Sequence, residues 1–170
     1  HPLSFERKPQ RTLYEKADLS TVGGAPVFYL PDKSLPLVDL TLLFKAGSVD
    51  VSDDKMGLTQ ILNDTLIHGG AGERSPQELA MVLDENAIRL AFSVNEEDTV
   101  VKLSVLKEDW DKGLALLLDI MTRPRFEEPV VPVSKEQLLT ALNRQGEGAR
   151  SVRRREAMIW HFRGHVYGRD

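Results

Sequence analysis

Residues 37–48 read LVDLTLLFKAGS, and residues 57–70 read GLTQILNDTLIHGG. In the first stretch, apolar residues occupy every second position, which is the period of a strand with one buried face. These positions are Val38, Leu40, Leu42 and Phe44. In the second stretch, apolar residues recur at the three- and four-residue spacing of an amphipathic helix that ends at two glycines. The two stretches predict a strand over Leu37–Lys45 and a helix from about Leu58 to Gly69–Gly70.

Further helices and strands are predicted after this pair. Ser75-Pro76-Gln77-Glu78 is a capping box with proline at the first helical position, so a helix should run from about Pro76 to Glu85. Two strands, about Ile88–Val94 and Thr99–Leu106, should pair antiparallel across an acidic turn. An amphipathic helix should follow from Trp110 and stop before Pro124.

Both ends of the chain also carry local signals. The first ten residues suggest an extended lead-in, and Arg11–Asp18 and Pro26–Leu30 suit the two strands of a hairpin. Near the C-terminus, a helix should start near Ser134 and be interrupted at Gly146 and Gly148. A last helix should span about Ser151–Phe162. Strands and helices in this order predict an α+β fold, a largely antiparallel sheet with helices packed on it.

Composition excludes several classes of protein. The 170 residues are 41% hydrophobic, which suits one sizeable core and one domain over 1–170 without an internal boundary. A net charge of -4 gives no electrostatic reason to bind nucleic acid, and no apolar run approaches the roughly 20 residues that span a bilayer. With no Cys, a disulfide framework and a thiolate zinc site are excluded. The bacterial periplasm and the cytoplasm fit equally well.

The order of several short motifs resembles the M16 peptidases, the pitrilysin/insulinase-like and processing-peptidase-like family. The motifs follow one another over nearly the whole chain at the spacing of that family. They are Leu35-Pro36-Leu37-Val38, Phe44-Lys45-Ala46-Gly47-Ser48, Gly57-Leu58, Gly69-Gly70, Ser75-Pro76-Gln77-Glu78-Leu79, Ser104-Val105-Leu106, Arg123-Pro124-Arg125-Phe126 and His165-Val166-Tyr167-Gly168-Arg169.

The resemblance implies a LuxS/MPP-like half-domain that pairs with a second, similar domain to enclose peptides in a chamber. In that family the N-terminal domain continues past the Tyr-Gly element. The resemblance therefore implies that residues 1–170 are the N-terminal part of one M16-like domain of a longer protein.

Active members of the family carry His-x-x-Glu-His on the helix after the glycine, with a Glu from a later helix as the third zinc ligand. In this sequence the three motif positions are Gln60, Asn63 and Asp64, and the later Glu position falls near Ala141 or Leu142. Neutral amides are poor zinc ligands and cannot serve as a base. The resemblance thus implies a degenerate site with no catalytic residue and no metal, and zinc only in a partner subunit.

Other candidate binding residues also have simpler structural explanations. His161 and His165 are four residues apart and could face one metal with Glu156 nearby, but Gly164 breaks the helix between them. His68 precedes the helix end, where capping is the favoured role. A basic cluster could meet an acidic partner or phosphate, or simply form a solvated helix face. Its members are Arg150, Arg153, Arg154 and Arg155.

A peptide-binding strand is also implied by the resemblance, because substrates of the related enzymes add a strand to the sheet edge that follows the zinc helix. That edge corresponds to residues 88–94, and the candidate contacts are Ile88, Leu90 and Phe92. Main-chain pairing needs no particular side chains, so this capacity could outlast the catalytic residues. An ordinary internal strand is the alternative.

Three functions therefore follow from the sequence as hypotheses. The first is a non-catalytic M16-like subunit that forms half of a peptide chamber with an active M16 peptidase subunit or a second M16-like domain. The second is a stand-alone peptide-binding or assembly module. The third is a zinc peptidase whose active half lies outside this chain. A peptide is the expected ligand in each case.

Overall fold

The computed structural model describes residues 17–146 and 148–169 of the chain. The chain divides into two compact units, residues 1–36 and residues 37–170. The first unit contains a β-hairpin, and the second contains a sheet with helices. Whether the chain forms a single domain over 1–170 stays a prediction.

The hairpin of the first unit is formed by β1 (Asp18–Val22) and β2 (Ala25–Tyr29), which pair antiparallel. Gly23 and Gly24 join them with φ of +57° and +85°, the left-handed values that a two-residue turn requires and that glycine adopts freely. The predicted hairpin is confirmed. Its first strand does not end at Asp18 as predicted but continues to Val22, because so short a turn makes the residues directly beside it pair. Residues 1–16 of that prediction lie outside the described part.

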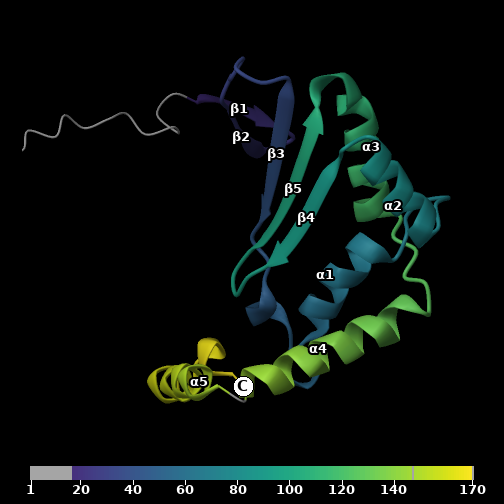
Figure 1. Cartoon of the computed structure of the whole chain (residues 1–170). Helices are drawn as coiled ribbons and strands as arrows, with labels where there is room; N and C mark the ends of the chain where they lie inside the picture. Colours follow the sequence, from purple (N-terminus) through teal and green to yellow (C-terminus); the bar gives the residue numbers. More distant parts are fainter. Residues whose placement is uncertain (1–16, 147, 170) are drawn as a thin grey trace, which may run out of the picture. The chain divides into compact units, whose positions relative to one another are not determined.

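The sheet of the second unit has the strand order β3-β5-β4. Its strands are β3 (Leu37–Phe44), β4 (Arg89–Val94) and β5 (Thr99–Leu106), and both pairings are antiparallel, as predicted (Figure 1). Leu103 lies opposite Leu40 on one side and Leu90 on the other, so these three residues share a face.

Helices α1 (Leu58–His68), α2 (Pro76–Glu85) and α3 (Trp110–Thr122) lie on the same side of this sheet (Figure 1). Their apolar side chains meet those of the sheet in one core. The buried members are Ala71, Leu79, Ile88, Phe92, Val101, Leu103, Val105, Leu116, Leu117 and Ile120. The predicted capping box of α2 is present, since the Ser75 side chain accepts from the Glu78 amide and the Glu78 carboxylate accepts from the Ser75 amide.

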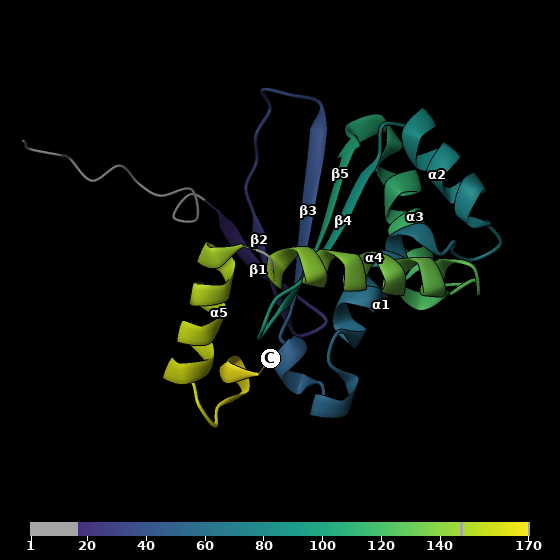
Figure 2. The same ribbon diagram turned by 60° about the horizontal axis from the view of Figure 1, so that its bottom comes forward.

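Two further helices follow, α4 (Val130–Gly146) and α5 (Ala149–His161). The start of α4 was predicted near Ser134 and is four residues earlier, because Pro132 falls in the first turn, where a missing amide hydrogen costs no helical hydrogen bond. The break between the helices falls at the predicted glycines. Helix α4 packs across α1 (Figure 2). Within the described residues, no helix is long and apolar enough to cross a membrane.

The loop after β3 is bound to the turn between β4 and β5. The amides of Ser48 and Val49 donate to the carbonyl oxygens of Asn95 and Glu96, each at 3.0 Å. Gly47 is buried, and a Cβ built on it would lie 2.2 Å from the Glu96 carbonyl oxygen. Glycine is therefore required here for close backbone approach.

The C-terminal turn, η5 (Val166–Gly168), is bound to the same region. The Tyr167 hydroxyl donates to a Glu97 carboxylate oxygen. Arg169 pairs with the Asp53 carboxylate at 2.8 Å and donates to the Val51 carbonyl oxygen at 2.7 Å. The Tyr-Gly motif thus ties the end of the described chain to the loops beside the sheet.

The Tyr167 contact should weaken at alkaline pH. The hydrogen bond to Glu97 is the main cause that raises the pKa of Tyr167 above its ordinary value of 10.0, followed by desolvation and the negative charges of Glu97 and Glu96. A raised folded-state pKa means that the contact contributes fully below the unfolded-state value and is lost as pH rises through the folded value. We expect Tyr167→Phe to lower the melting temperature at pH 8 and to leave it unchanged well above the raised pKa. Thermal unfolding of both proteins across this range measures the difference, and a gap that persists at the highest pH would contradict the explanation.

Candidate functional site

Helix α1 begins after Gly57, whose φ of +86° is a left-handed conformation suited to glycine. Gln60 and Asp64 are one helical turn apart, so their side chains leave the same side of α1. Asn63 lies between them on the adjoining face. The structure therefore places the three predicted motif positions on one helix with the spacing that a zinc motif would have.

The Asp64 carboxylate already has two partners. Its Oδ2 atom accepts a hydrogen bond from the hydroxyl of Ser134, a residue of α4 that is only 4% exposed. Its Oδ1 atom lies 3.1 Å from Nδ1 of His68, one turn further along α1. Asp64 thus joins α1 to α4 by a side-chain hydrogen bond. Nδ1 of His68 also lies 3.0 Å from the Asp64 carbonyl oxygen, and the predicted capping of free carbonyls by His68 stays a prediction.

The two amide side chains of the motif have different surroundings. Gln60 is exposed, and its Oε1 atom accepts from the hydroxyl of Thr59 at 2.8 Å. Asn63 is half-buried, and its Oδ1 atom is enclosed without a hydrogen-bond partner among the described residues. Neither amide offers a carboxylate that could accept a proton from water.

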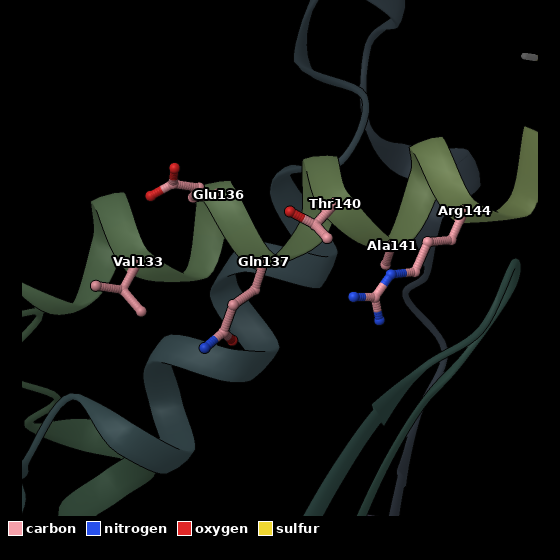
Figure 3. Close-up of a pocket in the computed structure, with 6 residues that line it drawn as sticks. All are labelled: Val133, Glu136, Gln137, Thr140, Ala141 and Arg144. Atoms are coloured by element: carbon pink, nitrogen blue, oxygen red, sulfur yellow. The ribbon is translucent and has the colours of Figure 1, made fainter.

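Helix α4 forms a wall beside α1. A shallow hollow of about 510 Å³ runs along α4, and Figure 3 shows its lining side chains on successive turns of the helix. They are Val133, Glu136, Gln137, Thr140, Ala141 and Arg144. Ala141 follows Ser134 by two helical turns and shares its face of α4, and both Ala141 and Leu142 are exposed. Of the two predicted positions for a third ligand, Ala141 is the one on the Ser134 face, and neither Ala141 nor Leu142 carries a ligand atom.

These residues do not fit a zinc ion. A catalytic zinc needs three protein ligands with nitrogen, sulfur or carboxylate donors, and here the four positions offer two amides, one methyl group and one carboxylate that is already hydrogen-bonded. Throughout residues 17–146 and 148–169, no group of three or more His, Asp or Glu side chains could hold a metal ion. Whether the chain binds a cofactor stays a prediction.

The second candidate metal pair is engaged in other contacts. Nδ1 of His165 accepts from the Tyr167 amide at 3.3 Å, and the His161 ring packs edge-on against Phe162. Gly164, with φ of +80°, turns the chain between the two histidines. Both rings belong to the aromatic contacts that hold the C-terminal turn.

The side chains of the predicted peptide-binding residues face the core, whereas the strand that follows Ile88 is an edge strand of the described sheet. Ile88, Leu90 and Phe92 turn their side chains into or against the core, with Ile88 5% and Phe92 6% exposed. The strand itself, β4, is an edge of the described sheet and lies alongside α1 (Figure 1). Peptide binding at this strand stays a prediction, and it would involve main-chain groups instead of these side chains.

Ser134 is the site residue that sequence reasoning missed. It was assigned only to a helix start, because a serine near a helix N-terminus is usually explained by capping. A hydroxyl 70 residues away from an isolated Asp on a predicted helix carries no signal of contact. The contact depends on how α4 packs on α1.

The bond between Ser134 and Asp64 should contribute measurably to stability. We expect Ser134→Ala to lower the free energy of unfolding by about 1 kcal/mol, since Asp64 loses a buried donor but keeps some access to water. Urea unfolding measures the change. The matched control is Ser93→Ala, an exposed serine of β4, for which a change within about 0.5 kcal/mol is expected. Equal effects of the two substitutions would contradict the proposed link.

A family model and a curated relative both match most of the chain. The model of the family "Insulinase (Peptidase family M16)" matches residues 27–166. A curated relative, the "Non-peptidase homolog YmxG" of Helicobacter pylori (strain ATCC 700392 / 26695), is 28% identical over 117 residues, which are 69% of this chain and 27% of the relative. The chain therefore spans little more than a quarter of the length of that relative.

Solved structures share the fold at low identity. A peptidase M16 inactive domain from Pseudomonas fluorescens has a TM-score of 0.83 and 20% identity over 91% of this chain and 38% of its own. The periplasmic protease PqqL from Escherichia coli has a TM-score of 0.76 and 16% identity, and the match covers 93% of this chain and 18% of PqqL. A protease from Helicobacter pylori has a TM-score of 0.74 and 16% identity, and the match covers 90% of this chain and 37% of that protease. These likenesses confirm the predicted α+β half-domain fold.

Proposed function

The chain belongs to the insulinase family, peptidase family M16, and on that premise we propose that it is a non-catalytic subunit that forms half of a peptide chamber with an active zinc peptidase of the same family. One observation carries the proposal. The α1 positions that would hold zinc and its base are Gln60, Asn63 and Asp64, and the Asp64 carboxylate is bound by Ser134.

Chemistry supports the absence of hydrolysis. Metal-assisted peptide cleavage needs a zinc-bound water and a group that accepts its proton. Amides do neither well, and the one carboxylate is held between Ser134 and His68. The side chains at these positions therefore favour a role in which the chain has the fold of the family but does not catalyse zinc-dependent hydrolysis.

The curated relative supports the same proposal, because it is named a non-peptidase homologue. The resemblance covers little more than a quarter of that protein, so the activity of the whole protein and its partner are part of the proposal. A partner with an intact His-x-x-Glu-His would supply the zinc. This chain would supply a wall of the chamber.

Peptide contact would use β4, an edge strand of the described sheet. Edge main-chain groups pair with an added strand independently of sequence, and the side chains of β4 that face the core already have their partners. The test uses one fluorescently labelled peptide and its backbone N-methylated copy. We expect the N-methylated copy to bind at least about 10-fold more weakly, since N-methylation removes the donors of strand pairing. Equal affinity of the two peptides would show that the edge is not used.

Catalytic inactivity has a direct test. The purified chain is loaded with zinc, desalted and examined by mass spectrometry, alongside cleavage of a quenched fluorescent peptide library. We expect no stoichiometric zinc and no cleavage. Stoichiometric zinc together with chelator-sensitive cleavage by this chain alone would overturn the proposal.

The partnership is tested separately. The chain is used as bait in extracts of its source cell, and recovered proteins are examined for an M16 enzyme with the intact motif. We expect such an enzyme to be recovered and to cleave peptides faster with this chain than without it. Peptide binding without any M16 partner at low or high salt would instead support the stand-alone module. An intact motif further along the same polypeptide would support the zinc peptidase with a separate active half.

A further inference from the structure

One face of α5 combines arginine, tryptophan and histidine side chains. Residues spaced three, four, seven, ten and eleven positions along a helix share one face. They are Arg150, Arg153, Arg154, Ala157, Trp160 and His161, here called the α5 face. All six are exposed. Trp160, at 77%, is the most exposed large apolar side chain of the described residues.

The other side of α5 is anchored. Ile159 and Phe162 are half-buried, and the Phe162 ring packs edge-on against Tyr167 with ring centroids 5.5 Å apart. Helix α5 also contacts α4 and the C-terminal turn. The anchored side holds the helix in place, so the α5 face is presented to solvent.

The arginines of this face are placed against the usual electrostatic preference of a helix. The first turn of α5 contains no acidic residue, although a helix N-terminus favours negative charge. Arg150 is followed at three and four positions by Arg153 and Arg154, a spacing at which like charges repel. Among the described residues, no ion pair involves any of these three arginines. A local rule broken without internal compensation is typical of a surface used for binding.

Charge is also unevenly distributed along the chain. Helix α5 contains four Arg and one Glu, a formal charge of +3, and the whole chain carries -4, so the remainder carries -7. The α5 face is therefore a local basic surface on an acidic chain. It would attract an acidic group, and the rest of the chain would repel an extended polyanion.

We propose that the α5 face binds a carboxylate-rich surface of another protein. Guanidinium groups form paired hydrogen bonds with carboxylates, and tryptophan and arginine are among the residues enriched at the positions that carry most of the binding energy of protein interfaces. Ala157, at the centre of the face, leaves room for a partner side chain between the arginines and Trp160. The proposal does not depend on the chamber function.

Two other classes of partner fit the α5 face less well. A membrane-surface helix buries a broad apolar stripe, whereas this face has one large apolar side chain among charged neighbours. Nucleic acid binding needs many phosphate contacts, whereas the face offers three arginines on a chain of net charge -4. A protein surface with a few carboxylates needs neither a broad apolar stripe nor many cations.

Fluorescence of Trp160 provides the test. The sequence has two tryptophans, so Trp110→Phe leaves Trp160 as the single reporter. The chain is titrated with a 15-residue peptide rich in Asp and Glu, and with its copy in which Asn and Gln replace them. We expect a saturable blue shift with the acidic peptide and an affinity at least about 10-fold higher than for the neutral copy.

Single-charge variants locate the binding surface. Arg153→Gln should weaken binding of the acidic peptide at least about threefold, whereas Arg163→Gln, an exposed arginine outside the face, should leave it unchanged. Circular dichroism checks that both variants fold. Equal losses in the two variants, no saturable shift with the acidic peptide, or tighter binding to phosphatidylglycerol vesicles or to a single-stranded oligonucleotide would each overturn the proposal.

Discussion

A variant with the four substitutions Gln60→His, Asn63→Glu, Asp64→His and Ala141→Glu is expected to retain one zinc ion per chain, which the native chain is not expected to do. Two imidazoles one turn apart on α1 share a face, and position 141 lies on the face of α4 that already reaches Asp64 through Ser134. The zinc affinity should rise by at least about three orders of magnitude, because two nitrogen ligands and a free carboxylate replace one amide, one hydrogen-bonded carboxylate and a methyl group at positions 60, 64 and 141.

Metal content after zinc loading and competition with a fluorescent chelator measure this gain. The control variant contains only Gln60→His and Asp64→His, so it lacks the α4 ligand and should bind zinc at least about 10-fold more weakly. Circular dichroism checks the fold of both variants. A folded four-substitution variant that holds zinc no better than the control would show that α4 does not present position 141 to α1.

Gly47→Ala is expected to lower the free energy of unfolding by about 3 kcal/mol. The added Cβ would lie 2.2 Å from the carbonyl oxygen and 2.5 Å from the carbonyl carbon of Glu96, and backbone atoms cannot rotate away as a side chain can. The turn between β4 and β5 would have to move, which weakens the bonds that Ser48 and Val49 make with it. Because the φ of Gly47 is -144°, the cost comes from contact and not from backbone strain.

Urea unfolding monitored by circular dichroism measures this loss. Gly148→Ala is the matched control, since among the described residues its added Cβ would meet only the Ser151 hydroxyl at 2.9 Å, and a hydroxyl can turn aside. A change within about 1 kcal/mol is expected for the control. If Gly47→Ala proved as mild as Gly148→Ala, the close approach at Gly47 would not explain why glycine is needed in this loop.

Local sequence signals were enough to place most elements of the fold. The alternation around Leu40 and the capping box at Ser75 each involve residues that are close in sequence, and β3 and α2 are found where those signals predicted them. The two shifted starts have different causes. The two-residue turn at Gly23 and Gly24 makes residues 18–22 pair as β1, and α4 starts at Val130 because a proline in the first helical turn breaks no hydrogen bond.

Some features of the candidate site could likewise be predicted from the sequence, and others could not. Residue types at positions 60, 63 and 64 are sufficient to predict that α1 is a poor zinc helix, because ligand chemistry depends on the side chain itself. The contact between Asp64 and Ser134 could not be predicted, since it joins residues of two helices far apart in sequence.

The sequence by itself therefore determined the family resemblance, the order of the elements and the loss of zinc-binding side chains. Each of these depends on residue identity and short-range spacing. Only the tertiary structure decided that Asp64 is held by Ser134, that β4 is an edge of the described sheet and that Ile88 and Phe92 face the core. These features depend on which faces of helices and strands meet, and that is decided by packing between segments that are distant along the chain.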